Sequence, residues 1–115
     1  MTRTWGDYVA DIRTAIHEIA AFIDGLTKDV FVNDRKTVNA VIRSLEVMGE
    51  AAKRIPEDVR AQHPDIPWKR MAGMRDKLIH EYSGVDLDTV WLVITEELPP
   101  LRPLVERLAK NLGES

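Results

Sequence analysis

The sequence predicts an all-α protein, an up-and-down antiparallel bundle of four principal helices with short extra helical turns. Apolar residues recur at three- and four-residue steps along most of the chain, which is the spacing of one helix face. No long alternating strand pattern, internal repeat or low-complexity tract interrupts this periodicity. With 115 residues, the chain is expected to fold as a single domain over residues 1–115.

The first helix is expected from about Trp5 to Leu26, with Gly25 near its end as a stop. A short linker, 27–33, can hold one further helical turn. Asp34 is suited to cap the second helix, because its carboxylate can accept from the free N–H groups of the first turn. The apolar stripes of these two helices are Trp5, Tyr8, Val9, Ile12, Ile16, Ile19, Ile23 and Leu26, then Val38, Val41, Ile42, Leu45, Met48, Ala52 and Ile55.

Prolines divide the stretch that follows. Pro56 ends or interrupts the second helix, and Pro64 breaks the next pieces. Pro67 is suited to the first turn of a third helix, which is expected over about residues 68–82 with a possible bend at Gly73.

A long apolar stripe predicts the last helix, and Asp86 is expected to cap it. Pro99, Pro100 and Pro103 should kink or break this helix near its middle, because proline lacks the N–H donor and clashes with the preceding turn. The stripe consists of Leu87, Val90, Trp91, Ile94, Leu98, Leu101, Leu104, Val105, Leu108 and Leu112.

Composition excludes several classes of protein. The chain has no cysteine, so disulfides, thiolate nucleophiles and cysteine-based zinc sites are absent. The N-terminus lacks an apolar signal region and no apolar run could cross a bilayer, which predicts a cytoplasmic protein without a membrane partner. A net charge of −3 argues against a general nucleic-acid coat protein, but it allows one local basic patch. That patch contains Lys69, Arg70, Arg75 and Lys77, opposed by Asp76, and charge alone favours its interpretation as a solvated helix face.

Most other chemical signals are weak. His17 has no second ligand four residues on, and the composition around His63 indicates a surface loop, so a structural interpretation is favoured for both histidines. Neither a metal nor another cofactor is expected. Ser44 and Ser83 lack a nucleophile elbow, and no glycine-rich phosphate loop is present. Glu46 and Glu50 share a helix face, which is more typical of a solvated edge than of an acid/base pair.

His80 follows the basic patch directly and lies five residues after Arg75. Arginine and histidine without metal ligands suit phosphodiester cleavage by a ribose 2′-OH. The imidazole can move the proton, while the guanidinium stabilises the negative charge of the transition state. On a straight helix, five residues advance about 500°, so the two positions point about 140° apart. Either the helix unwinds before His80, or two subunits share one site.

The run Arg75-Asp76-x-Leu78-x-His80-x-Tyr82 resembles the Arg–x4–His–x–Tyr signature of HepT-like toxins, which belong to the HEPN superfamily of helical ribonucleases. The resemblance extends to the blocks at 39–52, 66–75 and 85–99, including Gly49-Glu50-Ala51 and Glu97-Leu98-Pro99. It implies a homodimer in which two signatures face each other, and metal-independent endoribonuclease activity on tRNA or mRNA.

The resemblance also implies roles for individual residues. Arg75 would bind the phosphate, His80 would be the acid/base and Asp76 would orient the site, although many relatives have asparagine there. Tyr82 would accept AMP units from a minimal nucleotidyltransferase antitoxin, in a type VII-like toxin–antitoxin pair, and this would silence the enzyme by charge and bulk. The alternative is a non-catalytic helical subunit that binds nucleotide or docks onto a nucleotidyltransferase.

Overall fold

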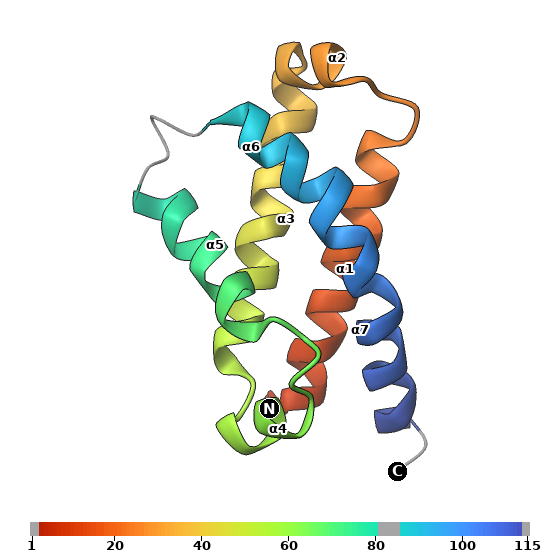
Figure 1. Cartoon of the computed structure of the whole chain (residues 1–115), viewed down its shortest axis with the longest axis vertical. Coiled ribbons are helices and arrows are strands. Elements are labelled where there is room, and N and C mark those ends of the chain that lie inside the picture. Colours follow the sequence, from red (N-terminus) through yellow and green to blue (C-terminus); the bar gives the residue numbers. More distant parts are fainter. Residues whose placement is uncertain (1–2, 81–85, 114–115) are drawn as a thin grey trace.

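The fold, seen in a computed structural model, is a helical bundle, and the structure describes residues 3–80 and 86–113, with backbone alone at 75–80 and 113. All regular structure in these ranges is helical, which confirms the all-α prediction (Figure 1). The elements in chain order are α1 (Trp5–Ile23), α2 (Lys28–Asn33), α3 (Arg35–Arg54), α4 (Glu57–Gln62), α5 (Trp68–His80), α6 (Leu87–Leu92), the π-helical η2 (Val93–Glu97) and α7 (Leu98–Gly113).

Helix α3 is the centre of the bundle. It packs against α1 on one side and α5 on the other, while α7 packs against α1 (Figure 1). Residues from every helix meet in one continuous apolar core. The side chains that are most fully enclosed are Phe31, Ile12, Ile19, Met48, Ile55, Met71, Val9, Val41 and Val105. No helix within the described ranges is long and apolar enough to cross a membrane.

The predicted helix boundaries follow from local chemistry. Asp34 accepts a hydrogen bond from the Thr37 N–H at 3.2 Å, and so caps α3 as expected. Asp86 caps α6 by accepting from the Asp88 and Thr89 N–H groups, at 3.0 and 3.3 Å. Gly25 takes a φ of 76°, a left-handed conformation that glycine adopts without strain, just after α1 ends.

Prolines shape the last helical run without ending it. The stretch immediately before Pro99 and Pro100 is π-helical, and the Leu98 N–H bonds to the Val93 carbonyl five residues earlier. This wider turn suits a place where two successive residues lack N–H donors and their rings crowd the preceding turn. Pro103 lies inside α7. The run from α6 to α7 therefore continues as helix, and it changes direction between the two (Figure 1).

Candidate functional site

Helix α5 carries the predicted catalytic positions. Its first turns are anchored by Trp68 and Met71, which are 7% and 0% exposed and face α3 in the core. The indole Nε1–H of Trp68 donates to the His63 carbonyl at 3.0 Å, which ties the preceding loop to the helix. The start of α5 is thus fixed in the core by packing and by a polar contact.

The backbone of α5 stays helical from Trp68 through His80. A helix that unwinds before His80 is therefore not the arrangement in this protomer. Positions 75 and 80 stay about 140° apart around the helix axis, as five residues of α-helix dictate. The side chains of Arg75, Asp76 and His80 lie outside the described residues, and Tyr82 does so entirely.

The basic patch divides into engaged and unengaged members. Arg70 pairs with Glu97 of η2, and this hydrogen bond, with the attraction of the carboxylate, raises the pKa of the Arg70 guanidinium. Lys69 is exposed, and no described side chain pairs with it. Sequence reasoning missed Glu97 because its partner lies 27 residues away on another helix.

His17 belongs to a polar network that joins α1 to α7. Its Nε2 contacts Glu106, whose carboxylate also accepts from Arg13 Nε at 2.9–3.0 Å. Arg102 approaches His17 Nδ1 at 3.5 Å. The bonds from Arg13 and then His17 hold the pKa of Glu106 below its ordinary value. This network supports the structural interpretation of His17.

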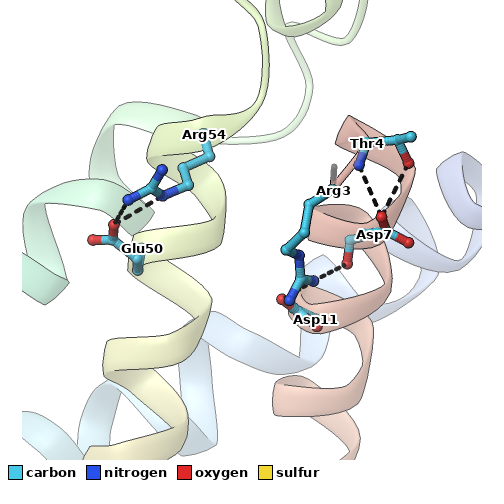
Figure 2. Close-up of polar contacts among 6 residues, drawn as sticks. All are labelled: Arg3, Thr4, Asp7, Asp11, Glu50 and Arg54. Atoms are coloured by element: carbon cyan, nitrogen blue, oxygen red, sulfur yellow. Dashed lines mark hydrogen bonds and ion pairs between the residues drawn. The ribbon is translucent and has the colours of Figure 1, made fainter. Parts of the chain in front are cut away.

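A second polar cluster lies over the groove between α1 and α3. Arg3 binds Asp11 at 2.6 Å, and Arg54 binds Glu50 at 3.0 Å (Figure 2). The Arg3 guanidinium also lies over the Tyr8 ring, 4.9 Å from its centroid. The groove beneath has a volume of about 300 Å³. Its charges are mixed and in large part paired, so it lacks the single sign that would select one charged ligand. Glu50 is an ion-pair partner here, in line with the interpretation as a solvated edge.

Among the described residues, no group of three or more His, Asp or Glu side chains lies close enough together to hold a metal ion. His63 contributes its backbone carbonyl to Trp68, and the structure shows no further site around it.

Comparison with known proteins gives one consistent result. The chain matches the family described as "Ribonuclease HepT-like" over residues 12–108. It is 47% identical to "Probable ribonuclease HepT" of Thermococcus cleftensis, over 96% of this chain and all of the relative. It is 45% identical to "Putative RNase MJ0125" of Methanocaldococcus jannaschii, over 90% of this chain and 96% of the relative. No solved structure matches the chain.

Proposed function

The chain belongs to the HepT-like ribonuclease family, and from this premise we propose that it is a metal-independent endoribonuclease whose site is shared by two protomers. Ribonuclease activity follows from the family and from the similarity over nearly the whole chain. The observation that carries the shared site is the unbroken helix from Trp68 to His80. It keeps Arg75 and His80 about 140° apart, so one protomer does not easily direct both at one phosphate.

In the proposed reaction, the ribose 2′-OH attacks the adjacent phosphorus, the P–O5′ bond breaks, and the products carry a 2′,3′-cyclic phosphate and a 5′-OH. His80 takes the 2′-OH proton or protonates the leaving 5′ oxygen. Arg75 of the facing protomer holds the phosphate and stabilises its added negative charge. Asp76 orients the arginine. RNA, with tRNA and mRNA as the candidate substrates, is the partner of this site.

Regulation forms the second part of the proposal. Tyr82, two residues beyond His80, is the acceptor of AMP from a minimal nucleotidyltransferase antitoxin. Each added AMP brings an anion close to the phosphate site, so repulsion and bulk would both oppose RNA entry. Mass spectrometry after co-expression tests this, because Tyr82→Phe should prevent the mass increase. Modification at another residue contradicts the assignment to Tyr82.

Mixed dimers test the shared site directly. Arg75→Ala and His80→Ala homodimers should each lose RNA cleavage in EDTA by at least about a hundredfold. After subunit exchange, half of the dimers are mixed and each contains one intact composite site. Activity should then return to about a quarter of wild type. If the mixture stays inactive while subunit exchange is verified, the site lies within one protomer. Undiminished cleavage by both single variants contradicts the assigned roles altogether.

A further inference from the structure

A shallow hollow of about 650 Å³ lies between α4 and the start of α5. Its floor is apolar, formed in part by Pro64, Ile66 and Trp68, and Ile66 and Trp68 are buried. Its rim is predominantly cationic. The charged members of the lining are Arg60, Lys69 and Arg70, with Glu57 as the acidic one.

Two of these cations have no anionic partner among the described residues. Arg70 is already bound to Glu97. Lys69 is exposed and has no partner among the described residues. The Nε–H of Arg60 is buried and finds no hydrogen-bond acceptor in the described structure. A buried donor without an acceptor is costly, so a rotation of the Arg60 side chain that brings its guanidinium to an acceptor from another molecule would be favourable.

The start of α5 adds to the positive field of the hollow. Pro67 precedes the helix, and its carbonyl accepts from the Met71 N–H at 3.1 Å. The proline side chain has no oxygen with which to cap the N–H groups of the first turn. The partial positive charge of this helix end therefore adds to that of Lys69 at the rim.

Register connects the hollow to the cleavage site. Positions 69, 73 and 80 fall within about 40° of one another around the axis of α5, and about 16 Å separates the first from the last. Between them lies Gly73, which is exposed, and a Cβ built there would meet nothing within 4 Å. Packing among the described residues therefore gives no reason for a glycine, whereas a glycine lets an external backbone approach the helix closely.

We propose that this hollow is a second RNA subsite, which holds a nucleotide some way along the strand from the bond that is cut. The base lies over the apolar floor, and its phosphate contacts Lys69 and Arg60 at the rim. The strand then passes Gly73 toward His80. The inference rests on the proposed ribonuclease function, because the same RNA must occupy both places.

Substrates of different length distinguish binding in the hollow from binding at the cleavage site. A dinucleotide reaches only the cleaved bond, whereas a longer single strand also reaches the hollow. Lys69→Gln should raise KM for the longer strand about threefold to tenfold, as for one contact between phosphate and a solvent-exposed charge, and leave kcat unchanged. Dinucleotide cleavage should not change. Lys110→Gln, at an exposed lysine near the end of α7, is the matched control. Equal effects of both variants, or equal losses on both substrates, overturn the proposal.

A measurement of RNA binding tests the subsite independently of catalysis. A 2′-O-methyl RNA strand lacks the attacking hydroxyl, so its affinity is measurable even if the protein cleaves nothing. Lys69→Gln should reduce the slope of log affinity against log salt by roughly 0.7, as for one lost phosphate contact with a single strand. Absent cleavage with this slope change rejects the proposed function and retains the subsite. Cleavage by the wild type together with an unchanged salt slope for Lys69→Gln retains the proposed function and rejects the subsite.

Ala61, an exposed residue of α4 in the lining of the hollow, is a position where a negative or a positive charge can be introduced. Ala61→Glu should weaken binding of the 2′-O-methyl strand severalfold and Ala61→Lys should strengthen it, because both residues are good helix formers and differ mainly in charge. The same pair of changes at Ala20, exposed on α1, should have little effect. If both Ala61 variants behave alike, the hollow does not bind RNA.

Discussion

The seam between α1 and α7 and the hollow between α4 and α5 both gather cations, but they use them differently. At the seam, Arg13 and His17 converge on Glu106, and their hydrogen bonds lower the pKa of that carboxyl. At the hollow, Lys69 and Arg60 surround an apolar floor, and neither binds a carboxylate of the described residues. Charged side chains that form ion pairs with each other hold two helices together. Charged side chains without such a partner within the protein are suited to bind a ligand of opposite charge.

The floor of the hollow should show the largest effect on stability. Trp68→Phe removes the indole N–H that donates to His63, and leaves that carbonyl without this partner. The free energy of unfolding should fall by about 1–3 kcal/mol, measured by urea denaturation. Binding of a long RNA strand should also weaken, because the loop that walls the hollow loses its tie. Trp5→Phe, at a half-buried tryptophan for which the structure shows no hydrogen bond, is the control. Equal costs at both positions contradict the role assigned to the bond.

The seam should respond to pH and not to RNA. Because folding lowers the pKa of Glu106, its contribution to stability is present above the unfolded-state pKa of about 4.3 and is lost as pH falls through the lower folded-state value. Glu106→Gln should therefore be less stable than wild type near neutral pH, and the difference should shrink in acid. Urea denaturation across this range measures it.

RNA affinity completes the test of the seam. Glu106→Gln should bind the 2′-O-methyl strand as wild type does, because this carboxylate already has its partners within the chain. Glu18→Gln, at an exposed glutamate of α1, controls for the loss of one negative charge. A stability difference that persists unchanged in acid, or a change in affinity specific to Glu106→Gln, removes the distinction between the two regions.

The smallest effect is expected at Glu57, the acidic member of the hollow's lining. Glu57→Gln removes a charge that repels phosphate, so affinity for a long RNA strand should rise about twofold to threefold. Asp58→Asn makes the same change of charge in the same first turn of α4, at a residue outside the lining. Fluorescence anisotropy at low salt can resolve such a difference. Similar gains for both variants indicate only an effect of net charge.

The helices themselves were predictable because their signals are local. Apolar spacing identified the core faces of α1, α3 and the last run, and Asp34 and Asp86 cap the helices they were expected to cap. The prolines were expected to kink or break the last run. Their consequence is a π-helical turn before Pro99 within a continuous helix, because neighbouring packing decides how a chain accommodates missing donors.

The features of the candidate site also divide into those that the sequence determines and those that depend on the tertiary structure. The sequence by itself determined that Arg75 and His80 lie five residues apart, and that a continuous helix would hold the two positions about 140° apart, since helical geometry depends on residue count alone. Only the tertiary structure decided that α5 remains helical through His80, that Glu97 forms an ion pair with Arg70, and that a cationic hollow forms beside Lys69. These features join residues far apart in the chain, and no local pattern encodes which helix face packs against which.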